Sequence, residues 1–298
     1  MSNLLKVSAY CALCLFQRGY MEILEATEDP AVRLQALQAF IQMLARNFTS
    51  TAVPSVIGTM RERLIKEVTG NLDPCAERKR RSNYEAMRVL PLVEETVSSE
   101  LDGGLRFRKA CLASIVGNIM EFHIPGHSFD YNQLSNLIHE AEKDLVIDDI
   151  PKAYNVARKA GLVLYLADNA GEIAFDTLLV KELVNATSKG RVVVAVKGKP
   201  VHNDATMEDA LFVGMDKVAD SLITTGTDAM GLIPSECGQE FLSYYDSADF
   251  VVVKGMGYAE TLTELGLRVP HFLLLRTKCM TVANYFQVPR EKNIAKIL

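Results

Sequence analysis

The protein has 298 residues, 49% of them hydrophobic and 23% charged, which is the composition of a globular protein with one large or two ordinary domains. Its 32 Lys and Arg and 37 Asp and Glu give a formal net charge of −5, which excludes the basic footprint of a general nucleic-acid-binding protein. No apolar run approaches the roughly 20 residues that a membrane helix needs, so we expect neither a nucleic acid nor a membrane as a partner.

Residues 1–16 contain a short apolar stretch of the kind found in secretory signals. Lys6 and two cysteines interrupt this stretch, and Gln17 and Arg18 follow it without an evident cleavage site. The whole chain has six cysteines, too few for a disulfide scaffold. We therefore expect a cytoplasmic protein with reduced thiols.

The first half of the chain is predicted to be helical. Asp29-Pro30 gives a helix both a capping side chain and a proline in its first turn, and apolar residues then recur at spacings of three and four. Pro91 is expected to end or kink the helix that contains it. The pattern predicts an all-helical domain over residues 1–150. Its further helices are expected over 54–68, after Asp73-Pro74 and over 107–122.

The second half alternates short apolar runs with helical stretches. The runs are hydrophobic at nearly every position, as strands buried on both faces should be. They occupy residues 162–167, 191–196, 221–225, 250–254 and 272–275. Strands that alternate with helices predict right-handed crossovers and a parallel sheet. We therefore predict an α/β fold, in which a doubly wound, mostly parallel, three-layer sheet domain over 151–298 follows the all-helical domain.

Acidic and amide side chains follow the first two runs, at the strand ends where such sheets bind ligands. Asp168 and Asn169 follow the first run, and Asp204 follows the second. Their oxygen atoms suit a hard cation such as magnesium or manganese, although turns and helix caps use the same residue types. Gly171 leaves room beside the backbone at a helix start, where free amides favour phosphate. His202 is expected to face solvent or to cap a loop.

Groups suited to phosphate follow the next two runs. Thr225 and Gly226 begin a small, hydroxyl-rich loop, and Lys254 ends the fourth run. A lysine at a buried strand end needs a partner, either a carboxylate or a bound anion. Oxygen ligands and lysines on one edge of the sheet together predict a site for a metal and a phosphate.

Three motifs in the second half carry a resemblance to a known family. They are Asp168-Asn-Ala-Gly-Glu172, Lys197-x-x-Pro-x-x-Asn-Asp-Ala-Thr206 and Lys254-Gly-x-Gly. The first half adds Cys11-x-x-Cys14-Leu-x-Gln17, Asp73-Pro74 with Asn83, and Gly117-Asn118-Ile119. This ordered set spans nearly the whole chain and resembles the damage-control phosphatases, in particular their CxxC-bearing subgroup of archaea and bacteria.

The resemblance implies a metal-dependent phosphatase that hydrolyses phosphomonoesters of small metabolites, either sugar phosphates or damaged phosphometabolites. It implies that Asp168, Asn169 and Asp204 hold a divalent cation, with magnesium, manganese, cobalt and nickel all possible. Lys254 would hold the phosphate, and Glu172 and Asn118 would border the site. Asp204, Glu172 and Asp168 all stay open as the group that takes the proton of the attacking water, and Asp168 could also attack directly. The chain departs from the family pattern at Tyr258, where an asparagine is expected.

Two alternatives stay open. A methyltransferase that uses S-adenosylmethionine also places an acidic residue at a strand end, but here the first strand is not followed by a glycine-rich turn. The second alternative is a non-enzymatic metal- or redox-responsive binding protein built around Cys11 and Cys14, with Cys75 or Cys111 as further zinc ligands. Two buried helix cysteines without a special role fit the same pattern.

Overall fold

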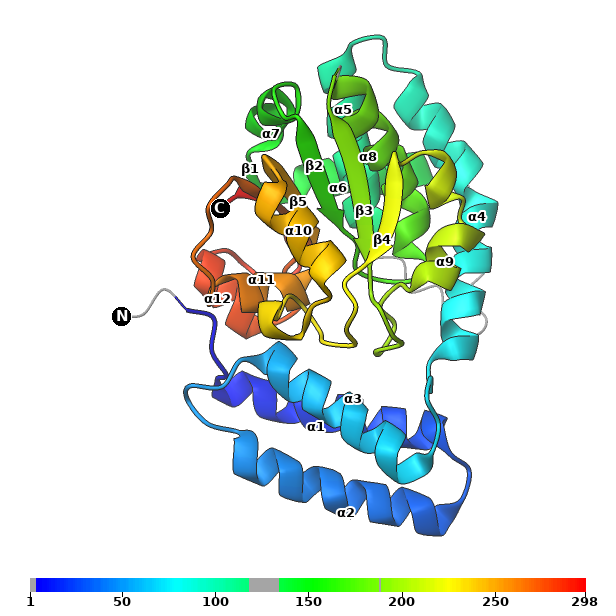
Figure 1. Ribbon diagram of the computed structural model, residues 1–298, viewed down its shortest axis with the longest axis vertical. Coiled ribbons are helices and arrows are strands. Elements are labelled where there is room, and N and C mark those ends of the chain that lie inside the picture. The colour runs from blue at the N-terminus through cyan, green and yellow to red at the C-terminus, as the bar shows by residue number, and fades with distance from the viewer. Residues whose placement is uncertain (1–3, 118–133, 188) are drawn as a thin grey trace.

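A computed structural model describes residues 4–117, 134–187 and 189–298 of the protein (Figure 1). Its centre is a seven-stranded sheet in the order β1-β7-β6-β5-β2-β3-β4. Neighbouring strands from β6 to β4 pair in parallel, whereas β7 runs antiparallel to β6 and parallel to β1. The predicted mostly parallel α/β fold is therefore confirmed. The strands are β1 (Leu145–Asp148), β2 (Leu162–Leu166), β3 (Arg191–Val196), β4 (Ser221–Thr224), β5 (Phe250–Lys254), β6 (His271–Arg276) and β7 (Asn293–Ile297).

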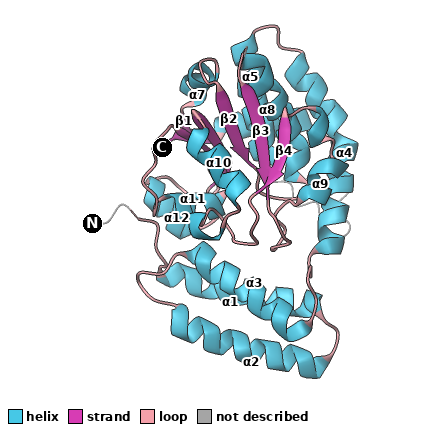
Figure 2. Cartoon of the chain, in the orientation of Figure 1, coloured by secondary structure: helices cyan, strands magenta, loops and turns pink. Residues whose placement is uncertain are grey.

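Helices cover both faces of the sheet, and three more lie across one of its edges (Figure 2). None of the helices in the described ranges is long and apolar enough to cross a bilayer. The α-helices are α1 (Ala9–Ala26), α2 (Pro30–Asn47), α3 (Pro54–Thr69), α4 (Ala76–Ser98), α5 (Gly103–Gly117), α6 (Leu134–Lys143), α7 (Ile150–Ala157), α8 (Glu172–Ala186), α9 (Met207–Phe212), α10 (Gln239–Ser247), α11 (Met256–Leu262) and α12 (Met280–Phe286).

Two of the local helix predictions have different outcomes. Asp29 caps α2 as predicted, because its Oδ1 accepts a hydrogen bond of 2.8 Å from the amide of Ala31 and Pro30 occupies the first turn. Pro91, in contrast, does not end its helix, since α4 continues to Ser98. An interior proline costs about 3 kcal/mol, and the burial of Val89 and Val93 on one face of α4 offsets that cost.

The alternation along β2 explains why the strands are apolar at every position. Val163 and Tyr165 point into the core that the sheet shares with α4, α5 and α8, whereas Leu164 and Leu166 belong to a second core on the opposite face. That second core also contains Phe241 of α10 and side chains of α11 and α12. A strand that is covered on both faces has no polar side to show.

The helices α1–α3 have small cores of their own and lie across the carboxyl ends of β2, β3 and β4 (Figure 1). We call them the helical layer. The described residues divide between α3 and α4 by the core to which they belong, because α4 packs on α8 and α5 and shares the large core of the sheet. Strand β1 also lies within the span predicted to be all helical. The division into domains at residue 150 stays a prediction.

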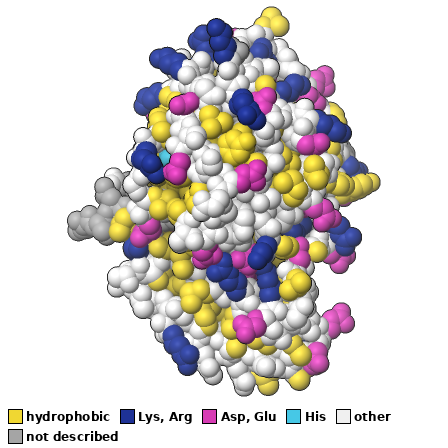
Figure 3. All heavy atoms as spheres, viewed as in Figure 1, with side chains coloured by type: hydrophobic (Ala, Val, Ile, Leu, Met, Phe, Trp, Pro, Cys, Tyr) yellow, Lys and Arg dark blue, Asp and Glu magenta, His cyan; other side chains and the backbone are white. Residues whose placement is uncertain are grey.

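The surface between the helical layer and the sheet is charged. Figure 3 shows acidic and basic side chains gathered where the two parts meet. Arg63 of α3 contributes to this junction through ion pairs with Asp228 at 2.7 Å and with Glu236. Each such exposed pair contributes little to stability, so we expect buried contacts to attach the helical layer to the sheet more tightly.

Candidate active site

The loops after β2 and β3 pair with each other and bring the predicted metal ligands together. The amide of Ala205 donates to the backbone oxygen of Asp168 at 2.7 Å, and the amide of Ala170 donates to that of Asn203 at 2.8 Å. Asn169 and Asp204 form an isolated β-bridge. The three predicted ligands therefore lie on two paired loops at the carboxyl edge of the sheet, as their positions after neighbouring strands predicted.

Side-chain contacts orient Asn169 for this role. Its amide nitrogen donates to Asp168 Oδ2 and to Glu172 Oε2, both at 2.8 Å. Because the nitrogen carries two protons, both are used, and the amide oxygen remains as the atom suited to a cation. Helix capping does not explain Asp204, since Thr206 and Asp209 form the capping box of α9.

Two buried lysines face four buried or half-buried carboxylates. Lys254 Nζ lies 2.5 Å from Glu172 Oε1 and 2.8 Å from Asp176 Oδ1, and Lys197 Nζ lies 3.6 Å from Asp204 Oδ2. With Asp168, these residues form what we call the buried charge cluster. If every group is ionised, the cluster carries an excess of two negative charges.

Burial and neighbouring negative charges raise the pKa values of two carboxyl groups in this cluster. Burial, followed by the charges of Glu172 and Asp204, raises the pKa of Asp168 well above its usual range. Burial likewise raises the pKa of Asp204 to about 6, although Lys197 acts in the opposite direction. A bound divalent cation would neutralise the excess charge, and the donor set consists of oxygen atoms. The residues therefore fit a hard cation.

Gly255 shows how closely β5 approaches the predicted metal ligands. It has a φ of +85°, and a Cβ placed on it would lie 1.8 Å from Asp168 Oδ2. Only glycine fits such a position, because both the backbone conformation and the space exclude a side chain. The Gly that follows Lys254 in the motif therefore makes room for Asp168.

The groups predicted to bind phosphate are engaged with the protein. Lys254 is fully buried, and it donates to the backbone oxygen of Ser114 at 3.1 Å as well as to Glu172 and Asp176. Its three protons are therefore used, and the carboxylate alternative for its partner is the one observed. Direct contact between Lys254 and a phosphate would require the exchange of one of these partners.

The other groups predicted to bind substrate lie in different surroundings. The amide of Gly171 donates to Asn83 Oδ1 at 2.6 Å, so it too has a partner. Thr225 is buried, and Gly226 packs against the backbone of Gly238. Asn118 lies outside the described residues. The roles of these groups in substrate binding stay predictions.

Sequence reasoning overlooked Lys197 and the role of Tyr258. Lys197 donates to the backbone oxygens of Ala229 and Gly231, each at 2.8 Å, and its Nζ lies 4.4 Å from the centre of the Tyr258 ring. Tyr258, the departure from the family pattern, is buried and covers this ammonium group. The position of Lys197 could have indicated this role, since Lys197 directly follows β3 and Lys254 is the last residue of β5.

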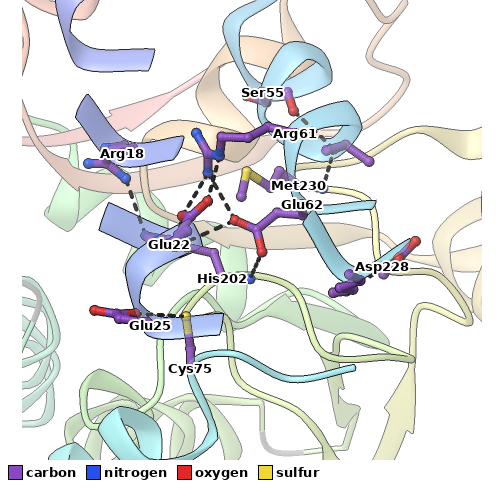
Figure 4. A network of polar contacts seen from close by, with 12 residues as sticks. Arg18, Glu22, Glu25, Ser55, Arg61, Glu62, Cys75, His202, Asp228 and Met230 are labelled. Carbon is purple, nitrogen blue, oxygen red and sulfur yellow. Dashed lines mark hydrogen bonds and ion pairs between the residues drawn. The ribbon is translucent and has the colours of Figure 1, made fainter. Parts of the chain in front are cut away.

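A second acidic group lies between the helical layer and the loop after β3 (Figure 4). Ligand atoms of Glu22, Glu62 and His202 all lie within 4.8 Å of one another, so the group could hold a metal ion. However, Arg61 already donates to Glu22 at 2.6 Å and to Glu62 at 3.0 Å. We therefore interpret the group as a buried ion-pair network. The expectation that His202 faces solvent or caps a loop was wrong, because its Nδ1 lies 2.6 Å from Glu22 Oε1.

One face of α3 contacts the segments that follow three of the strands. Ser55 Oγ lies 3.1 Å from the oxygen of Gly257, after β5, and Thr59 Oγ1 accepts from the amide of Met230, after β4, at 2.9 Å. Glu62 Oε2 accepts from the amide of His202, after β3, at 3.0 Å. The spacing of these α3 residues places them on one side of the helix.

The described geometry does not favour a zinc site at the CxxC pair. Cys11 is buried and its Sγ lies 3.2 Å from Thr281 Oγ1, whereas Cys14 is exposed. Cys75 contacts Glu25 at the other end of α1, about 21 Å from Cys11 at the rise of an α-helix. Cys111 is buried in the core beneath the sheet.

Comparisons with known proteins agree with the resemblance. Residues 7–294 match the model of the family described as "Damage-control phosphatase ARMT1-like domain". A protein of Archaeoglobus fulgidus named damage-control phosphatase is 35% identical over 295 residues, which cover 99% of this chain and 100% of that protein. A damage-control phosphatase of Pyrococcus horikoshii is 31% identical over 288 residues, 96% of each chain. The crystal structure of a DUF89 family protein from Pyrococcus horikoshii superposes with a TM-score of 0.87 at 30% identity, covering 97% of this chain and 98% of that one.

Proposed function

Because this chain belongs to the ARMT1-like damage-control phosphatase family, we propose that it is a metal-dependent phosphatase that hydrolyses phosphomonoesters of small metabolites. The observation that carries the proposal is the convergence of Asp168, Asn169 and Asp204 on two paired loops, within a cluster of four carboxyl groups and two lysines. We propose sugar phosphates or damaged phosphometabolites as the substrate class.

Asp168, Asn169 and Asp204 would hold the metal, and magnesium, manganese, cobalt and nickel are all compatible with their oxygen atoms. A bound divalent cation would offset the charge of the phosphoryl oxygens and lower the pKa of a bound water. Phosphoryl transfer passes through a loose transition state, so the main task of the protein is to position these groups. The mutual contacts of Asp168, Asn169 and Glu172 perform that task on the side of β2.

The contacts of Glu172 narrow the choice of the group that accepts the water proton. Its Oε1 faces Lys254 and its Oε2 accepts from Asn169, so both oxygens already have donors. We propose that Glu172 orients Asn169, and that Asp204 or Asp168 accepts the proton. The positive charges of Lys197 and Lys254 offset part of the negative charge of the neighbouring carboxylates.

The test is the release of inorganic phosphate from a panel of sugar phosphates, first in chelator and then with each divalent metal restored. We expect release only with metal, and we expect Asp168→Ala to abolish it in a protein that keeps the wild-type circular dichroism spectrum. Asp246→Ala is the matched control, because Asp246 pairs with the exposed Arg268 on the surface. Release in chelator, or full activity of Asp168→Ala, would contradict the proposal.

A further inference from the structure

A single amide side chain joins the two loops that carry the proposed metal ligands. Asn83 of α4 is 3% exposed. Its Oδ1 accepts from the amide of Gly171 at 2.6 Å, and its Nδ2 donates to Asp209 Oδ1 at 2.7 Å. Gly171 follows Asn169 by two residues, in the loop after β2. Asp209 lies in the first turn of α9, which directly follows the loop after β3 that carries Asp204.

Asp209 transmits this contact to the second loop. Its Oδ2 accepts from both the amide and the hydroxyl of Thr206 at 2.8 Å, which fixes the turn two residues after Asp204. Lys79, one helical turn before Asn83, lies 3.7 Å from the same Oδ2 and 2.8 Å from Asp73. Both oxygens of Asp209 are thus held by α4 on one side and by the turn on the other.

The contacts of Asn83 require an amide. One end of the side chain must accept a hydrogen bond while the other end donates one, and neither a carboxylate nor an apolar side chain does both. Gly171 has a φ of +80°, so the turn that presents its amide to Asn83 depends on glycine as well. Because both groups are buried, the loss of either hydrogen bond would leave a polar group without a partner.

We infer that Asn83 is a positioning residue that sets the distance between the two metal-ligand loops. The inference rests on the proposed function, since it assumes that Asp168, Asn169 and Asp204 hold the metal. The described hydrogen bonds of Asn83 go to Gly171 on one side and to Asp209 on the other, so it acts on the two loops through these residues. Changes to residues that orient metal ligands typically weaken metal binding 10–100-fold, so we expect an effect of about 10-fold or more on affinity.

The test exchanges the two partners. Asn83→Asp places two carboxylates against each other, and we expect it to weaken Mn²⁺ binding about 10-fold or more, measured by calorimetry. The double variant Asn83→Asp with Asp209→Asn restores a donor opposite an acceptor, while the carboxylate at position 83 still accepts from Gly171. We expect it to recover Mn²⁺ affinity to within about threefold of wild type. Recovery of this kind is not expected if residue 83 only packs α4 against its neighbouring helices.

Val89→Ala is the control for a loosened α4. Val89 lies on the same helix and is buried in the core beneath the sheet, so its truncation weakens the packing without touching either loop. We expect this variant to lose stability towards urea and to keep wild-type affinity for Mn²⁺. If Asn83→Asp does not fold, Asn83→Ser takes its place, because a hydroxyl is too short to reach both partners, and the same loss of affinity is expected.

The outcomes separate this inference from the proposed function. Absence of Mn²⁺ binding by the wild-type protein would overturn the proposed metal site and the inference with it. Wild-type binding combined with equal binding by Asn83→Asp, or with no recovery in the double variant, would overturn the inference alone. An equal loss in Val89→Ala would also overturn it, since general loosening of α4 would then suffice.

Discussion

The contact between Glu260 of α11 and Ser55 of α3 predicts a pH-dependent stability. Ser55 Oγ lies within hydrogen-bond distance of both Glu260 Oε2 and the backbone oxygen of Gly257. The hydroxyl has one proton, so it can serve only one of these acceptors while Glu260 is ionised. A protonated Glu260 can itself donate to Ser55 and leave the hydroxyl free to donate to Gly257. The neutral acid therefore satisfies the contact better.

Burial raises the pKa of Glu260 from 4.5 to about 7, although the hydrogen bond from Ser55 acts in the opposite direction. The folded protein thus binds a proton more tightly than the unfolded chain does. The contribution to stability is fully present below pH 4.5 and is lost as the pH rises through 7. One pKa unit corresponds to about 1.4 kcal/mol, so this carboxyl alone lowers the free energy of unfolding by at most about 3 kcal/mol between pH 4.5 and pH 8.

The assay is urea denaturation at pH 5, 6, 7 and 8 of the wild type and of Glu260→Gln, whose amide can donate at every pH. We expect the difference in unfolding free energy between the two proteins to move in favour of the variant as the pH rises. Glu264→Gln is the matched control, since Glu264 is a partly exposed surface partner of Lys6 and should leave the wild-type slope intact. Parallel curves for the wild type and Glu260→Gln would refute the reasoning.

Two further substitutions test buried features of the structure. Arg61→Ala leaves Glu22 and Glu62 without their buried partner, and we expect a loss of about 3–5 kcal/mol in urea denaturation. Arg268→Ala removes an exposed ion pair, should cost about 1 kcal/mol or less, and serves as the control. Gly255→Ala puts a Cβ into Asp168 at a positive φ, so we expect lower stability together with loss of metal-dependent phosphate release. Gly266→Ala, where a Cβ meets nothing within 4 Å, should leave both unchanged, and equal effects of the two alanines would contradict the steric argument.

The sheet and the edge at which Asp168 and Asp204 meet could be predicted because the relevant signals are local. A run such as Arg191–Val196 is apolar on both faces only where both faces are covered, and the residues that follow it must lie at the sheet edge. Asp168 and Asp204 could therefore be placed together from their positions after neighbouring strands. The family resemblance then suggested what they bind.

The other features of the fold and the site depend on which surfaces pack together, and this cannot be predicted from a single sequence. The apolar face of α4 has the same pattern whichever helices it packs against, so its place on α8 and α5, within the core of the sheet domain, was not predicted. For the same reason the partner of His202, which comes from α1, could not be named. Lys254 was correctly expected to need a partner. That this partner is Glu172 depends on where α8 packs, and the residues next to Lys254 in the chain do not indicate it.

The contacts of α3 have a consequence for how members of this family could be recombined. Because one face of α3 bonds to backbone groups of His202, Met230 and Gly257, exchange of one of these segments for one with a different backbone course leaves an unmatched partner on the helix. A chimera that transplants a single loop from a relative should therefore fold poorly. A chimera that moves α3 together with all three segments keeps these three hydrogen bonds internal, so the set can be transferred at this edge of the sheet with its mutual contacts intact.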